Sequence, residues 1–496
     1  MQFYRSGRMD AEVDPLLNHY YADVLKDPVF LEALHWYDVA NVVMLVEHGT
    51  IPRDAGKAIL EVLERERASG VPESRRDLEA TVHSGELVAR GQLGEEVSGW
   101  MHVGRSSPSI RVVASRISVR ERVIDLAGTL NVLRAVMAEL AERHADAVMP
   151  GSSYLQPIEI TTFGHYCLSW IDTFGRDVER FEGLFGRTNL GSGGTEAAYG
   201  TAYDLDLDRL NDLLGFPCQA TNTRDAIRQY DYLAEAFAAV AIMMNSLGRL
   251  AADLIVWNSS EYRYVEAPEK YVYTSSVAPQ MRIPWMQEVV NGLSGVAAGR
   301  LAGALAVSKT MSDQLEPATL MPVELWDTMQ ESGRALRVMT ELMDGLVVHR
   351  ETMAESARQS WAQMSTVMVY LVTECGVSYR SAHQVVARAC KRLADAGEPP
   401  SSLTSEVLEQ SAEAYLGRRI EVSPTELEAC LDPEHCVSLR TSPGGTAPVE
   451  VRRAAGEAKD AIRQDTIRWT RRAQHIEEAR ARTWERAQAI TSAPVQ

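Results

Sequence analysis

Residues 111–145 read RVVASRISVRERVIDLAGTLNVLRAVMAELAERHA and carry the longest regular pattern in the chain. Large apolar side chains recur in this segment at alternating spacings of three and four residues, at Val123, Leu126, Leu130, Leu133, Met137 and Leu140. That period places all of them on one face of an α-helix. The segment therefore predicts one long helix with a single apolar stripe.

Two further segments repeat the pattern. One stripe passes through Leu233, Phe237, Val240, Met244, Leu247, Ala251 and Leu254, and the other through Val289, Leu293, Val296, Leu301 and Leu305. Three such helices predict a bundle and an all-α fold. Stripes of this length need equally long partners, so we also expect the chain to form an oligomer.

The composition limits the class of protein. Hydrophobic residues make up 45% of the 496 residues and charged residues 24%, which is typical of a soluble globular protein. A net charge of -18 disfavours binding to nucleic acid. The amino terminus lacks the apolar core of a signal peptide, and we found no long uninterrupted apolar run. We therefore expect a cytoplasmic protein with no membrane partner.

The length exceeds that of one ordinary core and predicts several domains. We expect an N-terminal helical domain at 1–110, a central long-helix domain at 111–350, and a small helical domain with a tail at 351–496. The tail segment 449–488 is rich in Arg, Glu and Ala and has few large apolar side chains. It fits either a solvated helix or an interface helix.

Three interruptions between the helices carry residues capable of chemistry. The most unusual reads YTSSVAPQMRIP at 273–284, in which two serines precede a single cation. A serine can act as a base only if its alkoxide is stabilised, and a nearby cation can do that. Taken alone, the pattern is more often a turn with capping serines.

The other two interruptions are MPGSSYLQ at 149–156 and HVGRS at 102–106. Tyr154 in the first could move a proton if its pKa were lowered, although an isolated tyrosine is more often a packed ring. Arg105 in the second could bind a carboxylate, although an ordinary ion pair is the simpler interpretation.

Read in order, these segments resemble the motifs of argininosuccinate lyases, in the fumarase/aspartase superfamily. MPGSSYLQP is similar to MPGYTHLQ, HVGRSS to HTGRSRND, and TSSVAPQMRIP to the signature GSSxMPxKxNP. LGSGGTEAAYGTAYDLD resembles LGSGALAGTxxxID, and NTRDA at 222–226 resembles NSMDA. The similarity extends from about residue 30 to about residue 485 in the family order, far beyond what chance spacing produces.

The resemblance implies a homotetramer with a twenty-helix core, whose active sites each take loops from three subunits. It also implies β-elimination: a base removes a proton next to a carboxylate, and an amine leaves the neighbouring carbon. By position, the catalytic residues would be Ser276, Tyr154, Arg282 and Glu288. The substrate-binding residues would be His102, Arg105, Ser106, Ser107, Ser153, Gln156, Asn222 and Gln280. No cofactor is expected.

Several positions depart from the family pattern. Arg282 replaces the loop lysine, and Tyr154 replaces a histidine that the family couples to the glutamate matched by Glu288. The asparagines of the HTGRSRND and signature motifs are Pro108 and Ile283, and a signature lysine is Met281. Removing polar contacts from a site for a charged substrate weakens recognition strongly. We therefore expect a small anionic substrate other than argininosuccinate.

Three hypotheses remain open at this point. The first is a C–N lyase of specialised biosynthesis with Ser276 as its base. The second is the same fold used for cyclisation or isomerisation, and the third is a non-catalytic assembly protein. The histidines outside these motifs show no metal-ligand spacing, so no metal is expected.

Overall fold

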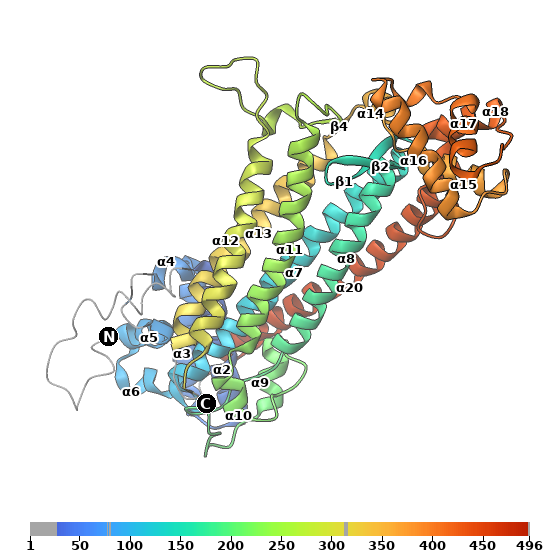
Figure 1. Cartoon of the computed structure of the whole chain (residues 1–496). Helices are drawn as coiled ribbons and strands as arrows, with labels where there is room; N and C mark the ends of the chain where they lie inside the picture. The colour runs from blue at the N-terminus through green and yellow to red at the C-terminus, as the bar shows by residue number, and fades with distance from the viewer. Residues whose placement is uncertain (1–26, 77, 79–80, 312–315, 495–496) are drawn as a thin grey trace.

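The computed structural model describes residues 27–76, 78, 81–311 and 316–494 (Figure 1). These residues are mainly helical, as predicted, and the longest elements run side by side as one elongated bundle. The bundle helices are α7 (Ser107–Arg143), α8 (Phe163–Thr188), α11 (Asp231–Trp257), α12 (Trp285–Ser308), α13 (Glu316–Asp344) and α20 (Pro448–Ser492).

Helix α7 contains the first predicted stripe. It begins at Ser107 because Ser106 and Ser109 form a capping box and Pro108 occupies the first turn. The six stripe residues are all buried, where α7 packs against α8, α13 and α20. The period of the sequence therefore identified the centre of the bundle correctly.

The other two stripes differ in burial. The stripe of α11 is buried throughout, whereas in α12 Val296 is 50% exposed and Leu305 is 54% exposed. Helix α12 packs against α11 by a different row of small residues that includes Ala297 and Ala304. One apolar face of α12 is thus left uncovered within the chain.

The tail forms a single helix of 45 residues, α20, which lies along α7. Its buried positions recur every seven residues, at Ala455, Ile462, Trp469, Ile476, Thr483 and Ile490. A seven-residue period is the seam of helices that pack in coiled-coil fashion. The tail therefore belongs to the core of the long helices.

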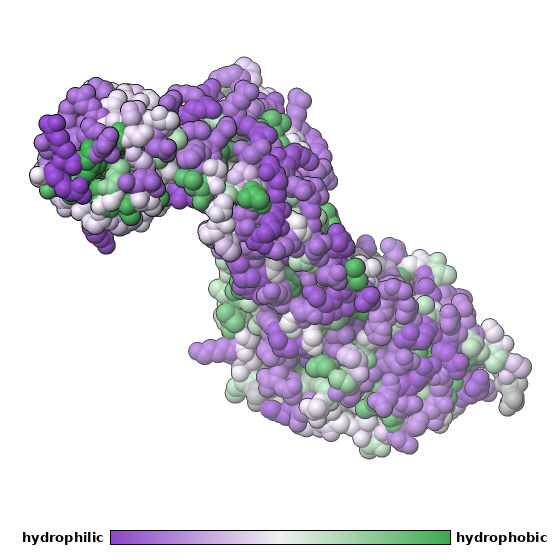
Figure 2. All heavy atoms as spheres, turned by 90° about the vertical axis from the view of Figure 1, so that its right-hand side faces the viewer, coloured by the Kyte–Doolittle hydropathy of each residue, from purple (hydrophilic) through white to green (hydrophobic). Residues whose placement is uncertain are grey.

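A smaller helical unit lies at one end of the bundle (Figure 1). It contains α15 (Met364–Thr373), α16 (Tyr379–Asp395), α17 (Ser405–Leu416) and α18 (Pro424–Leu431), which enclose an apolar core of their own. Figure 2 shows an elongated molecule with a lobe at each end and a largely polar surface. The domain boundaries at 110 and 350 stay a prediction, because α20 shares the large core rather than that of the smaller unit.

The opposite end holds the shorter N-terminal helices. They are α2 (Pro28–His48), α3 (Arg53–Ser69), α4 (Val71–Arg75), α5 (Ser84–Leu93) and α6 (Glu95–Ser98). Two short helices from later in the chain, α9 (Leu207–Leu214) and α10 (Thr223–Arg228), lie at the same end. The remaining helices, α14 (Arg350–Arg358) and α19 (Pro433–Ser438), lie beside the smaller unit.

Two small antiparallel sheets accompany the helices. A hairpin of β1 (Val148–Ser153) and β2 (Gln156–Thr162) joins α7 to α8, and β3 (Val265–Glu266) pairs with β4 (Val347–Val348). Both sheets lie at the end of the bundle that carries the smaller unit.

Among the residues that the structure describes, three helices are long and apolar enough to cross a membrane by length and composition alone: α2, α11 and α12. Most of α2 and α11 is covered by the protein itself, whereas α12 is covered little. The cytoplasmic location stays a prediction.

Candidate active site

The predicted site residues form two groups at opposite ends of the long helices (Figure 1). The first group contains Ser153, Tyr154, Gln156, Ser276, Gln280, Arg282 and Glu288, and the second contains His102, Arg105, Ser106, Ser107 and Asn222. Helix α7 separates them, because the second group precedes it and the hairpin of the first follows it. Its 37 residues span about 55 Å at about 1.5 Å per residue.

The loop between α11 and α12 carries Ser276 and projects from the end of the bundle (Figure 1). Tyr273 and Ile283 close its base by exchanging two backbone hydrogen bonds, at 3.1 and 2.7 Å. The rings of Tyr273 and Trp285 pack edge to face with their centroids 5.1 Å apart. The base of the loop is therefore fixed while its tip reaches outward.

The two adjacent serines have different surroundings. Ser275 Oγ accepts hydrogen bonds from the backbone N–H groups of Val277 and Ala278, both at 3.2 Å. It thus shapes the turn, as capping serines do. Ser276 is exposed at the tip of the same turn, where its hydroxyl can meet a substrate. The structural interpretation of this segment thus holds for Ser275, and the catalytic role of Ser276 stays a prediction.

Arg282 lies near the base of this loop and is half exposed. Its guanidinium forms an ion pair with Glu266 of β3 at 2.9 Å. His349 Nε2 lies 3.7 Å from the other oxygen of the same carboxylate. The pairing orients Arg282 and also neutralises part of its charge in the isolated chain.

The β1–β2 hairpin presents Tyr154 at the same end of the bundle. Tyr154 and Leu155 form its two-residue turn with φ values of 55° and 60°, a left-handed conformation that favours glycine or asparagine. The Tyr154 side chain is 96% exposed. Two large residues held in such a conformation indicate a constraint other than stability. The coupling of Tyr154 to Glu288, which is exposed in the first turn of α12, stays a prediction.

The second group surrounds the start of α7. Ser106 Oγ accepts a hydrogen bond from the backbone N–H of Ala197 at 2.9 Å, which ties the loop at 191–205 to this end. Asn222 caps α10 by accepting from the N–H of Asp225 at 2.9 Å. Its side-chain oxygen therefore has a structural role in the chain.

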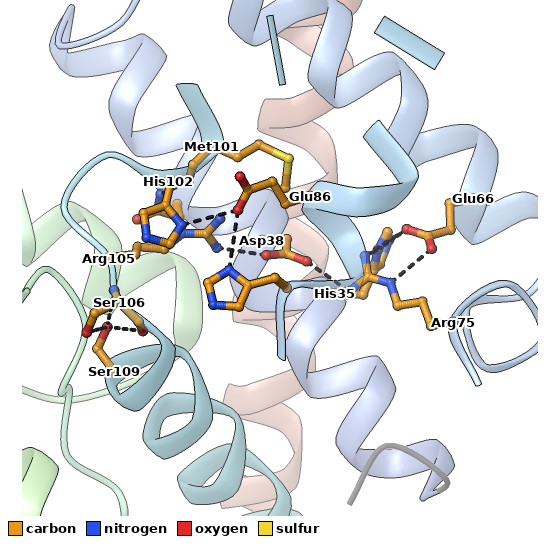
Figure 3. A network of polar contacts seen from close by, with 12 residues as sticks. His35, Asp38, Glu66, Arg75, Glu86, Met101, His102, Arg105, Ser106 and Ser109 are labelled. Atoms are coloured by element: carbon orange, nitrogen blue, oxygen red, sulfur yellow. Dashed lines mark hydrogen bonds and ion pairs between the residues drawn. The ribbon is translucent and has the colours of Figure 1, made fainter. Parts of the chain in front are cut away.

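Arg105 is buried, and its guanidinium donates to Asp38 Oδ1 at 2.7 Å (Figure 3). Arg75 donates to the other oxygen of Asp38 at 2.8 Å and to Glu66 at 2.7 Å. Burial raises the pKa of Glu66, but the Arg75 guanidinium more than offsets this and holds that pKa well below its usual range. The charge of Arg105 is thus met by the protein, and its substrate contact stays a prediction.

Sequence analysis missed two residues beside this network, His83 and Glu86. Glu86 Oε2 lies 3.2 Å from His102 Nδ1 (Figure 3). The same oxygen lies 3.3 Å from His83 Nδ1, and the centroids of the two imidazole rings are 5.1 Å apart. The spacing of His83 and Glu86 on one helical face was the available signal. This spacing indicated a cluster only once the structure had placed His102 beside Glu86.

The surroundings of Glu86 and His83 shift the pKa values of both side chains. Burial raises the pKa of Glu86, but hydrogen bonds from His102 and His83 outweigh burial and lower that pKa to about 2. Burial lowers the pKa of His83, although Glu86 opposes the shift. The atoms of these three side chains that could bind a metal ion, two imidazole nitrogens and one carboxylate oxygen, lie within 4.8 Å of one another. Their mutual hydrogen bonds already account for this closeness without an ion.

The two groups stay apart within the described chain. The first contains a serine hydroxyl and a guanidinium, and the second contains imidazoles, hydroxyls and a buried carboxylate. A cavity of about 500 Å³ in the smaller helical unit is lined by residues such as Leu403 and Leu427 and by none of the predicted site residues. The catalytic and substrate-binding roles of both groups stay predictions.

Comparison with known proteins finds matches over most of the chain. A family model described as lyase matches residues 47–299, and one described as argininosuccinate lyase C-terminal matches residues 362–438. The argininosuccinate lyase of Methanosarcina mazei is 30% identical over 465 residues, which cover 92% of each protein. Argininosuccinate lyase 1 of Shouchella clausii is 29% identical over 456 residues, covering 90% of this chain and 89% of the relative.

A solved structure of EDDS lyase in complex with formate has the same fold. It superposes with a TM-score of 0.86 over 97% of each chain, at 24% sequence identity. The family matches, the identity to curated relatives and the helical architecture agree with one another. The chain therefore belongs to the lyase family, as an argininosuccinate lyase-like member of the fumarase/aspartase superfamily.

Proposed function

We propose that this protein is a carbon–nitrogen lyase that acts by β-elimination on a small carboxylate substrate other than argininosuccinate. The observation that carries the proposal is the α11–α12 loop, which exposes Ser276 at its tip and holds Arg282 at its base. In a lyase of this family, that pairing supplies a base and a cation to one substrate.

The chemistry requires stabilisation of a carbanion. Removing a proton next to a carboxylate places a second negative charge on that group, which forms an aci-carboxylate. In the proposed mechanism Ser276 takes the proton and Arg282 offsets the developing charge. Arg282 would leave its ion pair with Glu266 and bind the substrate instead. Its positive charge would then be available to stabilise the carbanion.

The expected substrate follows from the cations and polar side chains that this chain keeps for binding it. Arg105 is paired with buried Asp38, and the polar positions of the family motifs are Pro108, Met281 and Ile283. A site with fewer free donors loses several kcal/mol of recognition for a highly charged substrate. We infer a substrate with one carboxylate next to the acidic carbon, and an amine as the leaving group.

The same proposal includes assembly into a homotetramer with shared sites. The two groups of site residues lie at opposite ends of one chain, and α12 leaves Val296 and Leu305 exposed on an apolar face. Antiparallel packing of chains along α12 would cover that face and bring one chain's Ser276 to another chain's His102. Burial of such a face provides the driving force for association.

A substrate panel tests the proposal. The protein would be assayed for alkene formation with argininosuccinate, with N-substituted aspartates and with β-amino monocarboxylates. We expect turnover of a monocarboxylate or an N-substituted aspartate and no measurable turnover of argininosuccinate. Ser276→Ala should abolish the turnover of the accepted substrate. Val277→Ala, at the adjacent exposed position of the same loop, should leave that turnover intact.

Two outcomes would contradict the proposal. Efficient cleavage of argininosuccinate would overturn the substrate assignment while leaving the lyase reaction in place. Turnover that survives in Ser276→Ala would overturn the mechanism, and complete inactivity of the wild-type protein on the panel would favour cyclisation, isomerisation or an assembly role.

A further inference from the structure

The histidine cluster at the second end of the bundle has no role in the mechanism given so far. We propose that His102, held by Glu86, is the general acid that protonates the departing amine. This inference rests on the proposed function, because it concerns the second half of the same elimination.

The hydrogen bonds define which nitrogen of each ring is used. An ionised carboxylate only accepts hydrogen bonds, so the Nδ1 atoms of His83 and His102 must both donate to Glu86. His83 Nε2 is then occupied by Ser107 Oγ at 2.8 Å. The side chain of His102 is 41% exposed, and its Nε2 remains for contact with a substrate.

The two histidines therefore differ in function. His83 is buried on η3 (Thr81–His83), where its ring supports the ring of His102 by stacking at an interplanar angle of 19°. His102 ends η4 (Gly99–His102), at the surface of the same cluster. A half-exposed imidazole with its inner nitrogen bound to a carboxylate is the arrangement by which proteins orient a histidine for proton transfer.

Three groups surround His102. Glu86 on α5 lies against its inner nitrogen, His83 lies against its face, and the nearby Arg105 is paired with Asp38. His83 is buried, whereas the side chain of His102 is partly exposed. His102 is therefore the imidazole of this pair that a substrate can reach.

Tyr154 is a weaker candidate for the same task. Phenols titrate near pH 10 and imidazoles near pH 6.5, so an imidazole matches proton transfer at neutral pH more closely. Tyr154 also projects from a tight turn with 96% of its side chain exposed, whereas His102 is held by two neighbours.

The step balances as follows. The Ser276 alkoxide takes the proton from the carbon next to the carboxylate, and the electron pair of that C–H bond becomes the new C=C bond. The C–N bond breaks with its pair on nitrogen, which receives the Nε2 proton of His102. The products are an unsaturated acid and a neutral amine, with Ser276 protonated and His102 neutral. Both groups then exchange protons with solvent.

The dependence on the leaving group tests this assignment. Two substrates with the same acid part would carry an arylamine and a trimethylammonium group. The arylamine nitrogen is neutral near pH 7 and needs a proton to leave, whereas the trimethylammonium group leaves as a neutral amine without one. His102→Gln should lower kcat for the arylamine substrate by about 100-fold or more, which is the usual contribution of a general acid. The trimethylammonium substrate should lose less than about fivefold, and His475→Gln on the exposed face of α20 should change neither.

The pH profile separates an acid from a merely structural residue. The wild-type rate with the arylamine substrate should fall on the alkaline side as the acid loses its proton, and His102→Gln should remove that fall. Glu86→Gln should move the fall without removing it, because Glu86 positions the imidazole rather than touching the substrate. His102→Asn is made beside His102→Gln, and the comparison uses the variant with wild-type circular dichroism.

Three results would overturn the proposal. Equal losses for both substrates in the His102 variant would assign it to substrate binding or structure. A leaving-group effect that appears in Tyr154→Phe instead would assign the acid to that phenol. Activity lost with a chelator and restored by Zn²⁺ would assign the cluster to a metal. Loss of both activities in Ser276→Ala is expected in every case, so failure of the elimination itself is recognised separately.

Discussion

The guanidinium of Arg105 and the carboxylate of Asp38 form a buried hydrogen bond of 2.7 Å, which joins the loop before α7 to helix α2. Asp38 also accepts from Arg75 at 2.8 Å, so one carboxylate serves two buried cations. The buried network thus meets the charge of Arg105 within the chain.

Asp38→Asn should destabilise the protein strongly. The amide would carry no charge between Arg75 and Arg105, and breaking a buried ion pair costs about 3 to 5 kcal/mol. Urea unfolding at fixed protein concentration measures the effect. Glu331→Gln, which removes the exposed pair of Glu331 and Arg334 at 2.6 Å, should change stability by less than about 1 kcal/mol. Equal effects of the two substitutions would contradict the role given to Asp38.

Mixing Ser276→Ala with His102→Gln should restore activity toward the substrate that needs a proton from the general acid. If Ser276 and His102 meet only across chains, Ser276→Ala and His102→Gln homo-oligomers each lack one group at every site. Random reassembly of equal amounts would give about a quarter of the sites both wild-type groups, if each group comes from a different chain. Unfolding and refolding the mixture before the assay tests this. No recovery from a mixture that forms hybrid oligomers would show that the site lies within one chain.

The exposed face of α12 should hold the oligomer together. Val296→Asp combined with Leu305→Asp places two charges on a face that is about half exposed in the single chain. Burial of an unpaired charge at an interface is heavily penalised, so we expect dissociation together with loss of activity. Sedimentation velocity measures the change. Val369→Asp, at a similarly exposed position on α15, should leave the oligomer intact.

Asp177 should make stability depend on pH. Its side chain is 1% exposed, and burial raises its pKa to about 6 although Arg180 opposes the shift. The folded state therefore favours the protonated acid, and the resulting stability is present below about pH 4 and lost as pH rises through about 6.

The difference from the ordinary value is about two pKa units, which corresponds to roughly 3 kcal/mol. Asp177→Asn should remove this dependence and be more stable than the wild type at pH 8, as measured by urea unfolding at pH 4 and pH 8. Glu179→Gln on the exposed side of the same helix is the control and should behave as the wild type does. A wild-type protein whose stability rises from pH 4 to pH 8 in step with Glu179→Gln and Asp177→Asn would refute the assignment.

The amino-acid sequence was sufficient to predict the long helices that carry stripes of large apolar residues. The stripe of α7 was predicted from its period, because that period is a property of neighbouring residues on one helix. The seam of α20 was missed, since it repeats every seven residues and uses alanine and threonine among its buried positions. With its large side chains as far as seven residues apart, such a seam resembles a solvated helix until its partner is known.

By itself the sequence also determined the family, the order of the loops, and the hydroxyl and guanidinium at positions 276 and 282. Only the tertiary structure decided that Arg105 is neutralised by Asp38, that His83 and Glu86 join His102, and that the site residues divide between two ends of the bundle. The physical reason is distance along the chain. Helical periodicity acts over a few residues, whereas ion pairs and shared sites depend on how helices tens of residues apart are packed.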